Sequence, residues 1–188
     1  MKSPIRLAAI AFLGFVLLFV VGAAHAQFQE IQKQAMDGDA VAQNKLARMY
    51  ALGQGGLEPN PLEAAKWFRR SANQSYPRSE YNMGMIYSRG EGVPKSMSES
   101  LRWYRKAADQ GYVRAQRKLG DFYAEGVGVP RNYVQAYMWY NLAAAAGDSE
   151  ARTARDRLSP KMNGSQIAEA QRLSVQFKPQ RRWRGPVE

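Results

Sequence analysis

The sequence predicts an all-α protein built as a solenoid of stacked helix–turn–helix repeats. The first observation behind this prediction is a repeated spacing of aromatic residues. Tryptophans recur every 36 residues, and the tyrosines that precede them recur every 36 or 37 residues. A fixed period of about 20 to 50 residues is typical of repeat architectures. The two aromatic series are Trp67, Trp103 and Trp139, and Tyr50, Tyr87 and Tyr123.

The second observation is that each period contains two apolar stripes with helical spacing. In the third copy, Ala115, Leu119, Phe122 and Tyr123 recur at i, i+4, i+7 and i+8, which places them on one face of a helix. Gly126 follows where a left-handed cap would end that helix. A second helix with its own apolar face comes next. The residues on that face are Ala136, Trp139, Tyr140, Ala143 and Ala144.

Small residues stand in the middle of each first helix, at Ala47, Gly84 and Gly120. A glycine inside a helix costs about 1 kcal/mol relative to alanine, so its use there needs a reason. We expect a neighbouring helix to approach closely at these points, with tryptophan and tyrosine rings packed against the small residues.

The repeats divide the chain into a repeat domain with a cap at each end. A single repeat cannot bury its apolar face alone, so capping helices are expected at both ends of the stack. The sequence Asn163–Gln166 has the form of a capping box that would open the last helix. The predicted boundaries are 27–177 for the domain, 27–38 for the first cap helix, 40–76, 77–112 and 113–148 for the repeats, and 149–176 for the final capping helices.

The N-terminal segment has the features of a secretory signal peptide. Two basic residues precede an uncharged apolar run over residues 7–24, and a small-x-small pattern ends at Ala26. We expect residues 1–26 to be removed and the rest of the chain to be periplasmic or secreted. The alternative is an uncleaved membrane anchor, because the apolar run is nearly long enough to span a bilayer.

Composition excludes several classes of catalytic site. The chain has 27 basic and 16 acidic residues and no cysteine, and cleavage after Ala26 would remove its one histidine and leave a net charge of +9. Ser-His-Asp and Cys-His catalysis and the usual zinc sites are then excluded. Carboxylates could still act as an acid–base pair, but no spacing singles one out among Glu91, Asp109, Asp121 and Glu125. We expect no cofactor, no metal and no enzymatic activity.

Two motifs identify the repeat type. One is Ala-x-x-x-Leu-Gly-x-x-Tyr-x-x-Gly-x-Gly-Val, from Ala115 to Val129, and the other is Ala-x-x-Trp-Tyr-x-x-Ala-Ala, from Ala136 to Ala144. The pattern resembles the Sel-one-like repeats, close relatives of the tetratricopeptide repeats, and covers about residues 40–148. The first copy departs from it at Ala47 in place of Gly, Gly56 in place of Val and Ser71 in place of Ala.

The resemblance implies a right-handed α-superhelix with an adaptor role, because family members usually scaffold or regulate protein complexes. The stretch 158–168 also resembles the closing segment of exported proteobacterial members, which are linked to envelope signalling, surface polysaccharide and host interaction. Some cysteine-rich relatives are described as binding or hydrolysing β-lactams. Those relatives contain disulfides, which this chain cannot form, so that activity does not transfer.

The variable positions of the first helices are the candidate partner-binding residues. In solenoids the shared positions form the framework and the variable ones carry recognition, and in tetratricopeptide-like stacks the first helices line a concave groove. Seven of twelve such residues are basic, which predicts a groove for an acidic peptide, a carboxylate terminus or an anionic glycan. The alternative is a solvated charged face. The twelve are Asn44, Lys45, Arg48, Arg78, Tyr81, Asn82, Met85, Arg89, Arg114, Arg117, Lys118 and Asp121.

Three other features have a structural and a functional interpretation. The repeated tryptophans could stack on sugars, but their fixed place on an apolar face favours core packing. The repeated Gly-x-Gly pairs favour turns rather than a phosphate-binding loop, which would need a strand before it. Trp183 lies in a basic segment, 178–188, that we expect to be disordered; it could insert into a membrane interface or a partner, or remain solvated.

The sequence therefore predicts a periplasmic or secreted adaptor that binds an acidic protein or peptide partner through a basic groove. The alternative is an envelope protein that binds peptidoglycan or acidic polysaccharide directly, and a cell-wall hydrolase is a third, weaker possibility. Export argues against nucleic acid as the partner. A membrane would be contacted only through an uncleaved N-terminal segment.

Overall fold

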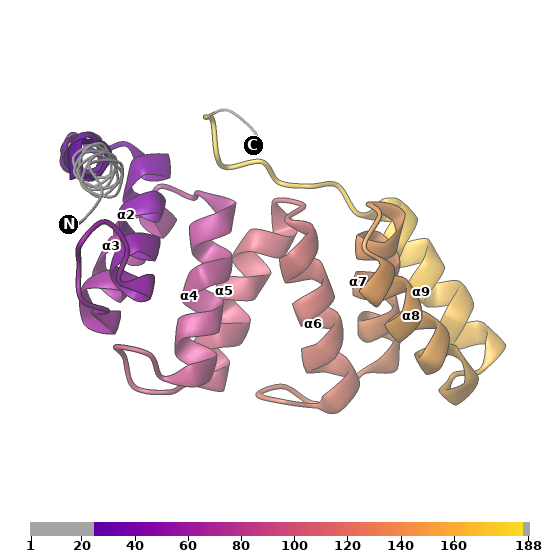
Figure 1. The fold of residues 1–188 in the computed structure, drawn as a ribbon. Coiled ribbons are helices and arrows are strands. Elements are labelled where there is room, and N and C mark those ends of the chain that lie inside the picture. Colours follow the sequence, from indigo (N-terminus) through magenta and orange to yellow (C-terminus); the bar gives the residue numbers. More distant parts are fainter. Residues whose placement is uncertain (1–24, 186–188) are drawn as a thin grey trace, which may run out of the picture.

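A computed structural model describes residues 25–185, and all regular secondary structure in this stretch is helical, without a strand (Figure 1). The predicted all-α solenoid is confirmed. Within this stretch no helix is long and apolar enough to cross a membrane. The predicted signal segment, apart from its last two residues, lies outside the described residues. After a helical segment at 25–36, the elements are α2 (Ala40–Leu52), α3 (Pro61–Asn73), α4 (Pro77–Arg89), α5 (Met97–Asp109), α6 (Val113–Glu125), α7 (Tyr133–Ala145), α8 (Ser149–Leu158), the 3-10 turn η1 (Ser159–Lys161) and α9 (Gly164–Gln176).

The helices pack in the order of the chain. Helices α2 and α3, α4 and α5, and α6 and α7 form three pairs, and each second helix also packs against the first helix of the next pair. Helices α8 and α9 both pack on α7 and close that end of the row. At the other end, Phe28 and Ala35 of the helical segment are buried in the core of the first repeat.

Helix boundaries follow from residues that the repeats share. Asn60, Ser96 and Asn132 precede the second helices, and each side chain accepts a hydrogen bond from a backbone N–H of the first turn. Gly90 and Gly126 end first helices with φ angles of 78° and 74°, a left-handed conformation that favours glycine. The Gly-x-Gly pairs therefore belong to turns, as predicted. The predicted capping box is also present at the start of α9.

The mid-helix glycines mark close contacts between the two helices of a repeat. A Cβ atom added at Gly84 would lie 2.6 Å from Cδ1 of Tyr104, and one added at Gly120 would meet the ring of Tyr140 in the same way. The predicted reason for Gly84 and Gly120 is confirmed, and the rings are those of the tyrosines that follow Trp103 and Trp139.

The repeat tryptophans are core residues. Trp67, Trp103 and Trp139 retain only 8%, 3% and 2% of their accessible surface, so they cannot form an exposed sugar-stacking ladder. Basic side chains lie over the faces of two of these rings: the Lys106 ammonium lies 4.2 Å from the centre of the Trp103 ring and the Arg70 guanidinium 4.4 Å from that of Trp67. Burial of these large rings supplies much of the apolar stabilisation of each repeat.

The C-terminal segment differs from the sequence expectation. Residues 178–185, which we expected to be disordered, extend back from α9 along the row of helices towards α4 (Figure 1). Trp183 is half-buried, with its ring 5.1 Å from that of Tyr76. Composition alone suggested disorder because the segment is basic and contains proline. It could not show that the acceptors for the segment's N–H groups, the Asp109 carbonyl and the Gln110 side chain, lie more than 70 residues earlier in the chain.

Candidate functional site: a basic groove along the first helices

Four adjoining clefts run along the first helices and share lining residues; we call them together the first-helix groove. Its central cleft has a volume of about 760 Å³ and lies between α2, α4 and the start of α6. Neighbouring clefts share Arg48, Asn82 and Met85 with it, which makes the groove continuous. The central cleft is lined by Arg48, Arg78, Tyr81, Asn82, Met85, Gly111, Tyr112, Val113 and Arg114.

The central cleft is positively charged. Three of its nine lining residues are arginines and none is acidic. Arg48 and Arg114 are exposed, and neither forms an ion pair with any residue between 25 and 185. Guanidinium groups bind carboxylates with paired, charge-assisted hydrogen bonds, so these two side chains could each hold an acidic group of a ligand.

An amide in the floor of the cleft is held in place by the preceding repeat. Asn82 of α4 donates from Nδ2 to Oδ1 of Asn44 at 3.0 Å, and the same oxygen accepts a 3.0 Å bond from Ser79. Asn44 is only 2% exposed, so its place is structural and it lines none of the four clefts. The Oδ1 atom of Asn82 makes no hydrogen bond within the described part of the chain, and it can accept one from the backbone N–H of a ligand.

Two tyrosines form the aromatic wall of the cleft. Tyr81 is buried, with its ring 5.4 Å from those of Tyr104 and Tyr112. Burial raises the pKa of the Tyr112 hydroxyl, while the charges of Arg114 and Arg78 act to lower it. A tyrosine hydroxyl is protonated at neutral pH, so Tyr112 can donate a hydrogen bond to a carboxylate.

The flanking clefts extend the groove to both sides. A cleft of about 490 Å³ between α2, α3 and α4 is more apolar and includes Leu52, Phe68 and Ile86. A cleft of about 320 Å³ lies at Lys45, and one of about 330 Å³ lies at Lys118 and Asp121. The structure therefore brings ten of the twelve predicted residues to one groove. The ten are Lys45, Arg48, Arg78, Tyr81, Asn82, Met85, Arg89, Arg114, Lys118 and Asp121.

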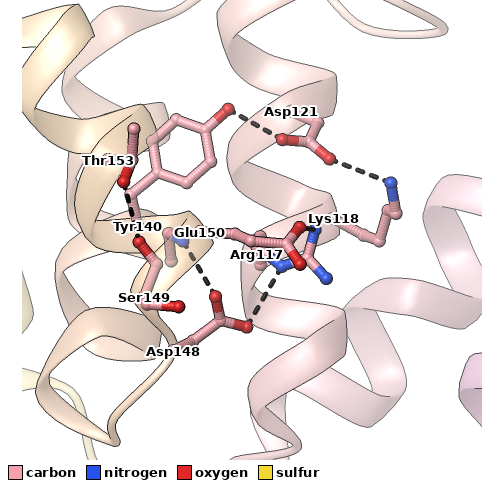
Figure 2. Close-up of polar contacts among 9 residues, drawn as sticks. Arg117, Lys118, Asp121, Tyr140, Asp148, Ser149, Glu150 and Thr153 are labelled. Carbon is pink, nitrogen blue, oxygen red and sulfur yellow. Dashed lines mark hydrogen bonds and ion pairs between the residues drawn. The ribbon is translucent and has the colours of Figure 1, made fainter.

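Arg117, the twelfth, belongs to a contact between repeats instead. Its Nε atom donates to Asp148 at 3.1 Å, and its guanidinium lies 2.7 Å from Glu150, both at the start of α8 (Figure 2). Asp148 also caps α8 by accepting a bond from the N–H of Ala151. Two carboxylates thus neutralise Arg117, and the positive charge of the groove is weaker at this end.

Lys118 and Asp121 are also paired with each other. The Lys118 ammonium lies 3.1 Å from one carboxylate oxygen of Asp121, and the other oxygen accepts a 2.9 Å bond from the Tyr140 hydroxyl (Figure 2). Burial, with the adjacent Asp121 charge, raises the pKa of Tyr140 above its ordinary value of 10.0. This hydroxyl therefore stays protonated and serves as a structural donor.

Sequence reasoning missed the residues that the turns contribute to the groove. Gly111 and Tyr112 precede α6 and line the central cleft, and Phe68 enters a flanking cleft from a second helix. A signal for Tyr112 was present, because Tyr76 stands at the corresponding place before α4. Both tyrosines are N-cap residues without a capping side chain, which indicates another use for their rings.

The Sel1 repeat family model matches the chain at residues 40–76, 77–112 and 113–148, which together make up more than half of its length. The chain belongs to the Sel1 repeat family. The matched boundaries coincide with the three helix pairs α2–α3, α4–α5 and α6–α7. Sel1 repeat proteins are mostly non-catalytic adaptors or regulators that bind protein partners.

Two curated relatives show the same repeats in larger proteins. The chain is 35% identical over 71 residues to the ERAD-associated E3 ubiquitin-protein ligase component HRD3A of Arabidopsis thaliana, and 36% identical over 64 residues to the chitin synthase regulator SKT5 of Saccharomyces cerevisiae. The matches cover 38% and 34% of this chain. They span only 10% and 9% of those proteins, so the likeness is one of repeats.

Two solved bacterial structures share the fold over a longer stretch. A Sel1 repeat protein of Oxalobacter formigenes is 37% identical, with a TM-score of 0.65, and the match covers 70% of this chain and 98% of that one. A protective antigen of uropathogenic Escherichia coli strains with an SLR fold is 26% identical, with a TM-score of 0.61, covering 83% of this chain and 42% of that one.

Proposed function

We propose that the chain is an adaptor that binds an acidic, extended segment of a protein partner in the first-helix groove. The observation that carries this proposal is the charge of the central cleft, where three arginines occur and no acidic side chain lines the wall. The cleft also offers what a peptide backbone needs, since Asn82 has a free acceptor and Tyr112 a hydroxyl donor. Repeat solenoids use their extended grooves in this way.

The arrangement favours a peptide over a polyanion. The three arginines of the central cleft come from α2, α4 and α6, and the adjoining cleft between α2, α3 and α4 adds apolar contacts through Phe68 and Ile86. A segment that alternates acidic and apolar side chains complements this surface. An acidic polysaccharide would use the arginines but not the apolar part of the groove.

The first experiment is affinity capture from an envelope extract with the chain 27–188 and two variants. In the groove variant, Arg48→Glu with Arg114→Glu, we expect the partner to be lost, because both side chains are exposed and unpaired within the described chain. The matched control is Lys33→Glu with Lys161→Glu, which makes the same change in charge on exposed residues that line none of the four clefts.

One or a few proteins retained by the wild-type chain and the control, but not by the groove variant, would support the proposal. Equal retention by all three chains would contradict it. Retention of peptidoglycan or polysaccharide without a protein would favour the glycan-binding alternative.

We also propose that the protein acts outside the cytoplasm, on the basis of the N-terminal sequence alone. The protein isolated from the producing cell should begin at Gln27, as measured by N-terminal sequencing and intact mass. If the protein retains residues 1–26 and is found in the membrane fraction, the segment is an uncleaved anchor and not a cleaved signal peptide. A chain that retains them in the cytoplasm would overturn export altogether.

A further inference from the structure

The C-terminal segment occupies a defined site on the repeats. Phe177 packs edge-on against Trp139 with their ring centres 5.4 Å apart, and Pro179 lies over Gly111, 3.5 Å from where a Cβ atom would stand. From there the extended segment crosses the turn between α5 and α6 and places Trp183 beside Tyr76, before α4 (Figure 1).

Backbone hydrogen bonds fix this segment at the turn. The N–H of Gln180 donates to the carbonyl of Asp109 at 2.7 Å. The N–H groups of Arg182 and Trp183 both donate to Oε1 of Gln110, at 3.1 and 2.9 Å. Bonds of this kind recognise an extended peptide whatever its side chains are.

Two side chains of the segment add selectivity. The guanidinium of Arg182 donates to the carbonyl of Lys106 at 2.7 Å and lies 3.9 Å from the carboxylate of Glu80, whose side chain is 2% exposed. The Trp183 ring lies against Tyr76, which is buried. A cation and the aromatic residue after it are therefore both recognised.

The pair of residues that binds the C-terminal segment, Gln110 with Glu80, is specific to the second repeat. Gln74, at the corresponding place in the first repeat, bonds the Gly38 carbonyl and Gln43, just as Gln110 bonds the Ser75 carbonyl and Glu80. The hydrogen bonds that hold the glutamine side chain are thus common to both repeats, but only Gln110 also accepts two N–H groups of the C-terminal segment. Glu80 is likewise a carboxylate where the first and third repeats have Gln43 and Gln116.

We propose that this surface, which we call the Gln110 notch, is a peptide-binding site for an extended segment with an arginine followed by an aromatic residue. Residues 180–183 occupy the notch as an internal ligand. The notch adjoins the first-helix groove at Gly111 but differs from it in chemistry, because it offers acceptors and a buried carboxylate where the groove offers arginines. The proposal is independent of the function proposed for the groove.

The test is binding of a fluorescently labelled peptide, residues 178–188, to the full chain and to a vacated variant, Arg182→Ala with Trp183→Ala. Both changed residues are outside the helices, so the fold should be unaffected. We expect the vacated variant to bind the peptide at least about tenfold more tightly than the wild type, because a tethered tail competes at high effective concentration.

Two controls locate the site. In the vacated background, Gln110→Ala should abolish peptide binding and Gln74→Ala should leave it unchanged. Circular dichroism of both variants checks that the fold is retained. A peptide in which the arginine and tryptophan corresponding to Arg182 and Trp183 are alanines tests selectivity without any change in the protein.

Equal peptide binding by the wild type and the vacated variant, or binding that ignores Gln110→Ala, would overturn the proposal. A wild-type dimer that dissociates in the vacated variant would show that the tail binds a second copy and would overturn the internal assignment.

Discussion

Replacing Glu80 by glutamine is expected to stabilise the protein above neutral pH and to leave it unchanged in acid. The Glu80 side chain is buried at 2% exposure and accepts a 2.8 Å bond from Gln110. Burial raises its pKa from 4.5 to about 7, and the charge of Asp109 acts in the same direction; the hydrogen bond from Gln110 and the charges of Arg182 and Lys106 act against it.

The direction follows from proton binding. Because the pKa is higher in the folded protein, the folded state holds more protons on this group between pH 4.5 and 7. The free energy of unfolding therefore falls as the pH rises through that window. At about 1.4 kcal/mol per unit of pKa, the cost above pH 7 is at most about 3 to 4 kcal/mol. Glutamine avoids this cost and can keep the bond to Gln110, as Gln43 does with Gln74.

Denaturant unfolding at pH 8 and pH 4.5 measures the effect. The control is Glu58→Gln, which changes an exposed carboxylate and should alter stability little at either pH. A Glu80→Gln protein that is less stable than the wild type at pH 8 would show that the ionised carboxylate supports the fold, and the prediction would be wrong.

Replacing Gly84 by alanine is expected to destabilise the protein by about 2 kcal/mol, the usual cost of overpacking a core. The added methyl group would lie 2.6 Å from two ring atoms of Tyr104. That ring cannot easily move, because it is 2% exposed and lies between Tyr81 and Phe122. The steric cost should exceed the gain of about 1 kcal/mol from better helix propensity.

A double-mutant cycle separates the steric cost from the gain in helix propensity. In a Tyr104→Ala background the clash is absent, so Gly84→Ala should become neutral or stabilising. Gly164→Ala is the matched control, since it lies in the first turn of α9 with no atom within 4 Å of the added Cβ. A Gly84→Ala protein that is more stable than the wild type by chemical denaturation would contradict the close-packing account.

Features set by the repeat period could be predicted from the sequence. Burial of Trp103 and Trp139, the glycine caps and the glycine–tyrosine contacts all follow from residues at fixed spacing on one or two helices. The face of the first helices that lines the groove followed from the same period. Which face of a helix lies opposite the core can be predicted from the local sequence alone. Because the repeats stack in the same way, the corresponding faces line one groove.

Features that depend on one particular neighbour could not be predicted. The helical periodicity placed Asn44 and Arg117 among the residues that line the groove. The next repeat buries Asn44 under Ser79 and Asn82, and the loop before α8 places Asp148 against Arg117. The tail was missed for the same reason, because Gln110 is 72 residues from Arg182 along the chain.

The central claim is that the first-helix groove binds an acidic partner segment through Arg48 and Arg114. The most direct test is titration of the captured partner against the wild type, the groove variant and the control at low and raised salt. We predict binding at least about tenfold weaker for the groove variant, a smaller salt dependence in that variant, and near-wild-type affinity for the control. Equal affinity of the groove variant and the wild type, or equal losses in both variants, would contradict the claim.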